Sequence, residues 1–190
     1  GTYSYTVTDA NGCTSSTSIT VSEPAALVAS SSATDILCNG GTATVTVSAV
    51  GGTAPYSGDG SFTVTAGTHS YTVTDANGCT SSTSITVSEP AALVASSSAT
   101  VILCNGGSST VTVSAVGGTA PYSGDGTFTV TAGTYNYTVT DANGCTSSTS
   151  ITVTEPAALV ASSSATDILC NGGTATVTVS AVGGTTPYSG

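Results

Sequence analysis

Residues 68–87 read THSYTVTDANGCTSSTSITV. Before the central DANG, Tyr71 and Val73 alternate with threonine, and after it Ile85 and Val87 alternate with serine and threonine. A period of two places apolar side chains on one face of a β-strand and polar side chains on the other. Asn-Gly between two such runs is typical of a tight hairpin turn. The stretch therefore predicts two antiparallel strands with one buried face.

The same alternation continues before this hairpin. Val45 and Val47 alternate with threonine, as do Phe62 and Val64, and glycine-rich turns separate the runs. No stretch shows helical periodicity. The strands expected in one segment are 27–34, 42–50, 54–57, 61–66, 68–75 and 80–88. Short strands at this spacing predict an all-β fold, specifically a small immunoglobulin-like antiparallel β-sandwich.

The sequence repeats with a period of 66 residues. TVTDANGC ends at Cys13, Cys79 and Cys145, and ILCNGG contains Cys38, Cys104 and Cys170. Such a period is too long for a solenoid coil and suits a small bead-like domain. We therefore expect a tandem array of such domains. Its parts are the C-terminal part of a truncated repeat at 1–24, complete repeats at 25–90 and 91–156, and the N-terminal part of a truncated repeat at 157–190.

The charge balance excludes several classes of function. The chain of 190 residues contains ten acidic residues and no lysine or arginine, so its formal net charge is −10. Binding to nucleic acid or to an anionic membrane surface requires cationic side chains, so we expect neither. No apolar run is long enough for a transmembrane helix, and no signal peptide is visible.

The motifs CNGG, GGTAPYSG, GT-x-x-YTVTDANGC and TVSEP together resemble the SprB-type repeat. This repeat occurs in very large surface adhesins of gliding bacteria, and the resemblance covers the whole chain. It implies a strand order like that of PKD and fibronectin type III modules, export from the cell, and display on the bacterial surface as a long stalk or filament. The segment from Tyr56 to Phe62 is shorter than the corresponding segment of the family, so the resemblance implies one strand fewer here.

Six cysteines at regular spacing indicate disulfides in an oxidising, extracellular location. Zinc sites typically use close pairs such as C-x-x-C, which are absent from the sequence. Three periodic pairings remain. They are Cys38–Cys79 with Cys104–Cys145, or Cys13–Cys38, Cys79–Cys104 and Cys145–Cys170, or Cys38–Cys145. We expect the first, because four alternating strands between Cys38 and Cys79 bring both to the same end of a domain. A crossover between them would favour the third.

Acidic turns make calcium the alternative to a purely structural interpretation. Carboxylates without cationic partners can bind Ca²⁺, and the D-x-N-G and G-D-G turns supply them. The candidate ligands are Asp35, Asp59, Asp75, Asn77, Glu89, Asp125, Asp141 and Asn143. Asp35, Glu89 and Asp141 would meet at a joint between domains. We favour the simpler interpretation, a hairpin turn in which the aspartate caps the backbone, because the spacing matches only half of an EF-hand loop.

Nothing in the sequence indicates catalysis. His69 is the only histidine, and no nucleophile and base recur together in the repeats. We expect Tyr71 and Tyr137 to be tyrosine-corner residues whose hydroxyl groups bond to the backbone. Tyr56 and Tyr122 are the first aromatic side chains to examine for glycan binding.

Together with the resemblance, the sequence thus predicts an extracellular structural protein of the bacterial surface that is not an enzyme and has no cofactor, with Ca²⁺ as the alternative named above. Its repeats would space and display an adhesive tip, with neighbouring repeats as partners and disulfides as mechanical support. Two alternatives remain open. The repeats themselves could bind a glycan or surface, or several chains could assemble into an extracellular fibre.

Overall fold

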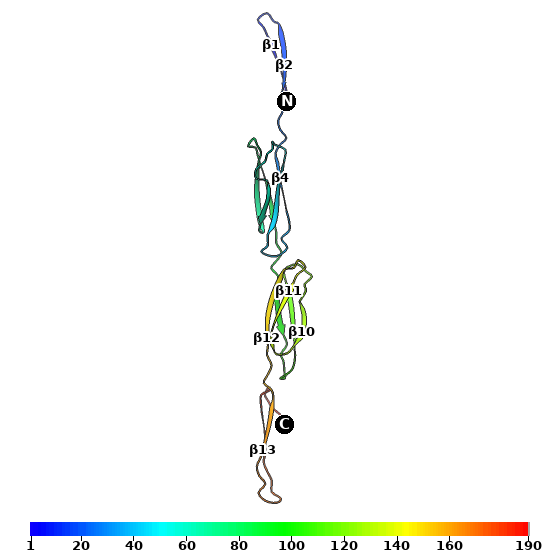
Figure 1. Ribbon diagram of the computed structural model, residues 1–190, viewed down its shortest axis with the longest axis vertical. Helices are drawn as coiled ribbons and strands as arrows, with labels where there is room; N and C mark the ends of the chain where they lie inside the picture. Colours follow the sequence, from blue (N-terminus) through cyan, green and yellow to red (C-terminus); the bar gives the residue numbers. More distant parts are fainter. Residues whose placement is uncertain (190) are drawn as a thin grey trace. The chain divides into compact units, whose positions relative to one another are not determined.

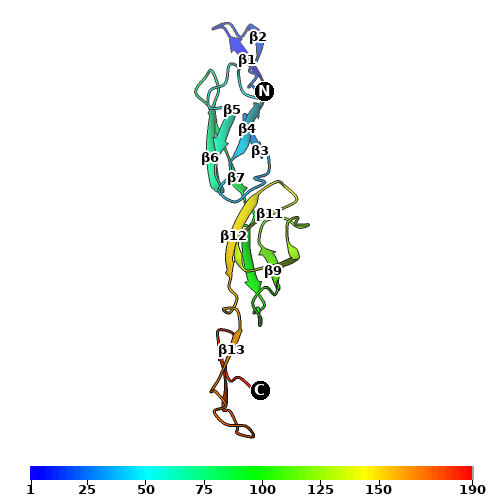
Figure 2. The same cartoon turned by 60° about the horizontal axis from the view of Figure 1, so that its bottom comes forward.

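The computed structural model describes residues 1–189 (Figure 1, Figure 2). Every regular element in this range is a β-strand, and all strands that pair into sheets are antiparallel. None of the described residues forms a helix that could span a membrane. The chain forms two compact units. The first unit comprises residues 1–36 and 40–89, and the second comprises residues 37–39 and the chain from Pro90 onward.

The first unit contains seven strands in three sheets. Strands β1 (Thr2–Thr8) and β2 (Thr14–Thr20) form a hairpin. Strands β3 (Val28–Ala33), β4 (Ala43–Val50) and β5 (Gly60–Val64) form a sheet in that order. Strands β6 (Gly67–Thr74) and β7 (Thr80–Val87) form a second hairpin, with the turn at residues 75–79 between them.

The second unit has the same kinds of sheet. Strands β8 (Val94–Ala99), β9 (Ser109–Val116) and β10 (Gly126–Val130) form one sheet, with β9 in the middle. Strands β11 (Gly133–Thr140) and β12 (Thr146–Val153) form a hairpin. Strands β13 (Val160–Ala165) and β14 (Val177–Val182) pair with each other.

Five of the six strands expected between residues 27 and 88 are confirmed, and their ends differ from the expected ones by at most two residues. The strand expected at 54–57 is wrong, because only an isolated bridge between Ser57 and Thr74 forms there. Pro55 has no backbone N–H to donate to a ladder. Gly58 has a φ of 85°, which turns the chain out of the extended conformation directly after the bridge.

The core of the first unit lies between the sheet β3-β4-β5 and the hairpin β6-β7. Val45 on β4 and Val73 on β6 are both fully buried and belong to the same hydrophobic cluster. In the second unit Val111 on β9 and Val139 on β11 do the same. The alternation of apolar and polar residues is thus a true inside-outside pattern, and the packing of the two sheets is consistent with a β-sandwich.

Side-chain hydroxyl groups close one edge of each sandwich. The backbone N–H of Ala29 on β3 donates to Ser81 Oγ on β7 over 3.1 Å, and the hydroxyls of Ser31 and Thr83 are 2.9 Å apart. Because both partners advance by two residues in the same direction, β3 and β7 run parallel. The second unit repeats this contact between β8 and β12, where Ala95 N–H donates to Ser147 Oγ over 3.0 Å.

Candidate functional site

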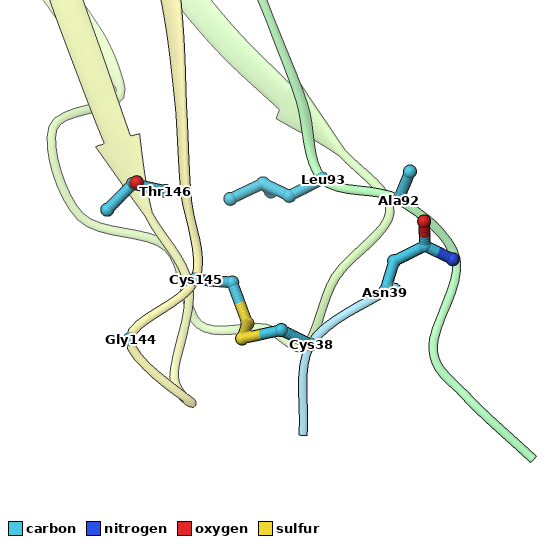
Figure 3. Close-up of a pocket in the computed structure, with 7 residues that line it drawn as sticks. All are labelled: Cys38, Asn39, Ala92, Leu93, Gly144, Cys145 and Thr146. Atoms are coloured by element: carbon cyan, nitrogen blue, oxygen red, sulfur yellow. A yellow bond between two sulfur atoms is a disulfide. The ribbon is translucent and has the colours of Figure 1, made fainter. Parts of the chain in front are cut away.

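The one disulfide among the described residues joins Cys38 to Cys145, whose Cα atoms are 5.7 Å apart. Both cysteines belong to the second unit, although they are 107 residues apart and come from successive repeats of the sequence. Next to the bond, Asn143 Nδ2 donates to the carbonyl oxygen of Leu37 over 3.1 Å. Figure 3 shows the bond beside a hollow whose other lining residues are Asn39, Ala92, Leu93, Gly144 and Thr146.

The pairing expected first, Cys38–Cys79 with Cys104–Cys145, is wrong, and so is the second, Cys13–Cys38, Cys79–Cys104 and Cys145–Cys170. The third alternative, Cys38–Cys145, is the bond observed. Since no strand forms at 54–57, three strands rather than four separate Cys38 from Cys79. Strand β4 is antiparallel to β3, β3 is parallel to β7, and β7 is antiparallel to β6. Strands β4 and β6 therefore run in the same direction. Cys38 precedes β4 and Cys79 follows β6, so the two lie toward opposite ends of the sandwich.

Asp141 holds the turn that presents Cys145. Its side chain is 6% exposed. Oδ1 accepts the backbone N–H groups of Asn143 and Cys145, each over 2.9 Å, and Oδ2 accepts the N–H of Thr119, also over 2.9 Å. Asp75 makes the same three bonds in the first unit. The carboxylate thus fastens the hairpin turn to the loop that takes the place of the expected strand.

These hydrogen bonds hold the pKa of Asp75 and Asp141 below the ordinary aspartate value. For Asp75 the backbone N–H of Thr53 is the largest cause, partly offset by burial and reinforced by Cys79 and Asn77. For Asp141 burial acts in the opposite direction and tends to raise the pKa, but the N–H groups of Thr119, Cys145, Asn143 and Gly144 together outweigh it. Both carboxylates are accordingly stabilised in their charged form.

Gly118 makes the contact between Thr119 and Asp141 sterically feasible. Its φ of 57° lies in the left-handed region, and a Cβ built at this position would lie 2.6 Å from Asp141 Oδ2. A side chain here would displace the carboxylate from the backbone donors. The second glycine of the repeated GGT motif is therefore part of this structural site.

The candidate calcium ligands do not form a shared cluster in the described residues. No three aspartate, glutamate, histidine or cysteine side chains gather within residues 1–189. The bonds of Asp75 and Asp141 to Asn77 and Asn143 N–H are those of an aspartate turn, which agrees with the simpler interpretation. The candidates that lie exposed are Asp35, Asp59, Asn77, Glu89, Asp125 and Asn143.

In each unit the backbone of a CNGG turn donates a hydrogen bond to the glutamate of a Glu-Pro segment, a contact that the sequence did not lead us to expect. In the first unit the N–H of Gly40 donates to the Glu89 carboxylate over 2.6 Å. In the second unit Gly106 N–H donates to Glu155 over 2.6 Å. Asn105 Nδ2 also reaches the carbonyl oxygen of Pro156 over 3.2 Å. The fixed spacing between Asn-Gly and Glu-Pro in each repeat is the sequence signal that could have indicated this pairing.

The tyrosine expectations need correction. The hydroxyl of Tyr137 is buried and finds no hydrogen-bond partner among the described residues, so it is not a tyrosine-corner residue. Tyr56 and Tyr122 instead donate to the carbonyl oxygens of Gly51 and Gly117, each over 2.6 Å. Both rings are partly buried against the core.

His69 and the remaining cysteines complete the set of predicted residues. His69 lies on strand β6, as expected. Its Nε2 atom lies 2.9 Å from the carbonyl oxygen of Thr65. Cys13, Cys79, Cys104 and Cys170 carry free thiols and are exposed.

Comparisons of the chain with protein-family models and with curated proteins find no match. The resemblance to the SprB-type repeat therefore remains a prediction.

Proposed function

We propose that this chain is part of an extracellular stalk or filament, a tandem array of immunoglobulin-like β-sandwich domains that spaces and displays the adhesive tip of a bacterial surface adhesin of the SprB type. The observation that carries the proposal is the Cys38–Cys145 bond. It connects successive 66-residue repeats covalently at a point other than the peptide backbone. A chain with this second connection resists extension better than one with a single backbone connection.

The strand order supports the immunoglobulin-like interpretation. Sheets of the order β3-β4-β5 and β6-β7, with β3 parallel to β7 along one edge, correspond to such a sandwich in which one strand is reduced to the Ser57–Thr74 bridge. Each domain is small, so covalent and hydrogen-bonded reinforcement contributes a large fraction of its stability.

The chemistry supports an extracellular location. A disulfide persists outside the cell and is reduced in most cytosols. The net charge of −10, with no lysine or arginine, keeps such a chain soluble and weakly attracted to nucleic acid. Both features suit a long surface structure whose task is mechanical.

Stretching single molecules tests the mechanical role. The bond shields the segment from Cys38 to Cys145, a sequence separation of 107, from the applied force. At about 3.3–3.6 Å per extended residue, adding a reductant should lengthen the fully extended chain by roughly 350–385 Å. The Cys38→Ser variant should show the long form without reductant, whereas Cys104→Ser should behave as the unmodified chain.

Two outcomes would count against the proposal. A reductant-dependent gain that comes in steps of only about 135–150 Å would mean bridges of 41 residues within single repeats, which leave successive repeats unconnected. Free thiols at Cys38 and Cys145 in freshly secreted material would remove the covalent connection altogether, and with it the mechanical argument.

A further inference from the structure

Two of the Asn-Gly pairs in this chain lie against a glutamate carboxylate. In the second unit, the N–H of Gly106 donates to Glu155 Oε2 over 2.6 Å, and Nδ2 of Asn105 donates to Glu155 Oε1 over 3.2 Å. One carboxylate thus contacts both the backbone nitrogen of the glycine and the side-chain amide of the asparagine before it. These are the two nitrogen atoms that exchange places on the asparagine Cγ when an Asn-Gly pair closes into a succinimide ring.

The first repeat arranges the same groups next to the disulfide. The N–H of Gly40 donates to Glu89 Oε2 over 2.6 Å, and Nδ2 of Asn39 donates to the carbonyl oxygen of Pro90 over 3.1 Å. Asn39 directly follows Cys38 (Figure 3). Asn39 is exposed, as is its counterpart in the second unit, so water reaches both turns.

We propose that Glu155 and Glu89 act as catalytic residues for deamidation of the asparagine beside each of them, Asn105 and Asn39. A positioned carboxylate can take a proton from one nitrogen and return it to the other, first as general base and then as general acid. Glycine favours ring closure because it has no side chain to shield its nitrogen. Apart from the adjacent residues, no atom lies within 4 Å of a Cβ built at Gly106, so the turn has room for the rotation that closes the ring.

The reaction balances without any other catalyst. As the Gly106 nitrogen bonds to Asn105 Cγ, Glu155 Oε2 takes the proton of that nitrogen. The bond from Cγ to Nδ2 then breaks, and the carboxyl group returns the proton to Nδ2, which leaves as ammonia. Water opens the remaining succinimide ring at either carbonyl carbon and leaves an aspartyl or isoaspartyl residue. One water is consumed, one ammonia is released, and Glu155 ends as it began.

A third Asn-Gly pair provides the comparison within the same chain. The N–H of Gly78 donates to the backbone carbonyl oxygen of Asp75 over 3.0 Å, and Nδ2 of Asn77 donates to Thr53 Oγ1 over 2.9 Å. A carbonyl and a hydroxyl group do not accept a proton at neutral pH, and the Asp75 carboxylate is occupied by three other backbone N–H groups. Asn77 is also exposed, so access of water does not distinguish the sites. We expect Asn77 to react much more slowly.

Deamidation changes the charge of the turn. The neutral amide of Asn105 becomes a carboxylate beside Glu155, and the chain contains no lysine or arginine to offset it. Like charges repel, so the product should hold the Glu-Pro segment less well than the original turn does. At Asn39 the same change falls next to the disulfide-bonded Cys38. The modification is thus a slow and irreversible loosening of the contact that each turn makes.

Peptide mapping by mass spectrometry tests the chemistry. The oxidised full chain is incubated for weeks in neutral buffer, cut with a protease that does not require lysine or arginine, and examined at each asparagine for a gain of one dalton and for isoaspartate. Asn39 and Asn105 should convert well before Asn77. In urea the three rates should become similar, and those at Asn39 and Asn105 should fall, because only the folded chain places a glutamate beside them.

Two variants, each the control for the other, separate catalysis from a structural role. Glu155→Gln should slow the conversion of Asn105 by roughly 10²-fold, the low end of what a positioned acid–base group contributes, and leave Asn39 unchanged. Glu89→Gln should do the reverse. If the glutamate only held the turn rigid, its loss would free the backbone and speed the reaction. The sign of the change therefore decides between the two roles.

Amide hydrogen exchange tests the loosening. Asn105→Asp places a product carboxylate in the turn from the start. The Gly106 N–H should then exchange faster, whereas the Gly40 N–H, which keeps its contact with Glu89, serves as the reference in the same chain. Equal exchange at Gly106 before and after the substitution would mean that the modification leaves the contact intact, and the loosening would be wrong.

Three results would overturn the catalytic assignment. Asn39 and Asn105 could convert no faster than Asn77 in the folded chain, they could convert no more slowly in urea, or their rates could stay unchanged or rise in the glutamine variants. None of these results affects the proposed stalk role, which rests on the Cys38–Cys145 bond. Free thiols at these two cysteines would overturn that role and leave the chemistry of Asn105 in place.

Discussion

At the residue scale, stability rests on a few small apolar side chains and on buried carboxylates. Val45 and Val111 are fully buried, although each contributes only three side-chain carbon atoms. Asp75 and Asp141 are buried without any cation and are satisfied entirely by backbone N–H groups. A chain without lysine and arginine can thus bury acidic groups where turns offer several N–H donors to one carboxylate.

Replacing Val45 by alanine should destabilise the first unit by about 2–3 kcal/mol. The substitution removes two buried methyl groups and leaves a cavity between the two sheets. Val50→Ala on the same strand is the matched control, because Val50 is 66% exposed and should change the free energy of unfolding little. Urea unfolding measures both. Equal effects of the two substitutions would contradict the assignment of the core face.

Asp141→Asn should lower the melting temperature of the second unit by several degrees at neutral pH. An asparagine amide has only one acceptor, its oxygen, because its nitrogen is a donor. It therefore cannot replace both carboxylate oxygens, which accept the N–H groups of Asn143, Cys145 and Thr119. Asp125→Asn, in an exposed turn, is the control.

The effect should depend on pH in a defined direction. The pKa of Asp141 is lowered in the folded state, so its contribution to stability is fully present above the ordinary aspartate pKa of about 3.9. It is lost as the pH falls through that value and through the folded pKa below it. The difference in melting temperature between Asp141→Asn and the unmodified chain should therefore shrink below about pH 4. A difference that stays constant from pH 7 to pH 2 would exclude this role of the carboxylate.

At the scale of the elements, the hairpin and the three-stranded sheet meet in two different ways. Their inner faces meet in the apolar cluster. Along one edge, hydroxyl groups of β7 bond to β3 in the first unit, and hydroxyl groups of β12 bond to β8 in the second. The serine and threonine rows are therefore not equivalent. Those on the closing edge satisfy backbone and side-chain groups, and those on the outer faces pair with each other across strands, as Thr72 does with Ser82.

Ser147→Ala tests the edge contact. The change leaves the N–H of Ala95, which is partly buried, without its acceptor and should cost about 1–2 kcal/mol in the free energy of unfolding. Ser150→Ala on the same strand is the control, because Ser150 is exposed. Amide hydrogen exchange at Ala95 gives a second measurement, and faster exchange should appear only in Ser147→Ala. Unchanged exchange would mean that this hydroxyl does not bond the strand.

At the scale of the whole molecule, the directions of the three strands between two cysteines of one repeat decide which cysteines can form a bond. A complete repeat brings its CNG cysteine and its DANGC cysteine toward opposite ends of one sandwich, so a bond between successive repeats replaces one within a repeat. The hydrogen bond from the Gly40 N–H to the Glu89 carboxylate then holds the turn two residues beyond Cys38.

Reduction of the Cys38–Cys145 bond should destabilise the chain by up to about 4–5 kcal/mol, as expected from chain entropy for a closed loop of roughly 100 residues. Urea unfolding with and without reductant measures the change. Cys38→Ser should reproduce the reduced state, whereas Cys104→Ser should not, because Cys104 is free. Equal sensitivity of the two variants would contradict the pairing.

The sequence by itself determined the strands, their inward faces and the hairpin turns, because a period of two and Asn-Gly turns act through neighbouring residues. Five strands of the 25–90 repeat and the buried valines on β4 and β6 were predictable in this way. Only the tertiary structure decided the disulfide partner, the acceptor of the Tyr56 hydroxyl and the contact of Gly40 with Glu89. The physical reason is that each depends on where distant strands end. A single strand lost at 54–57 reverses the end at which Cys79 lies, and no local pattern records that change.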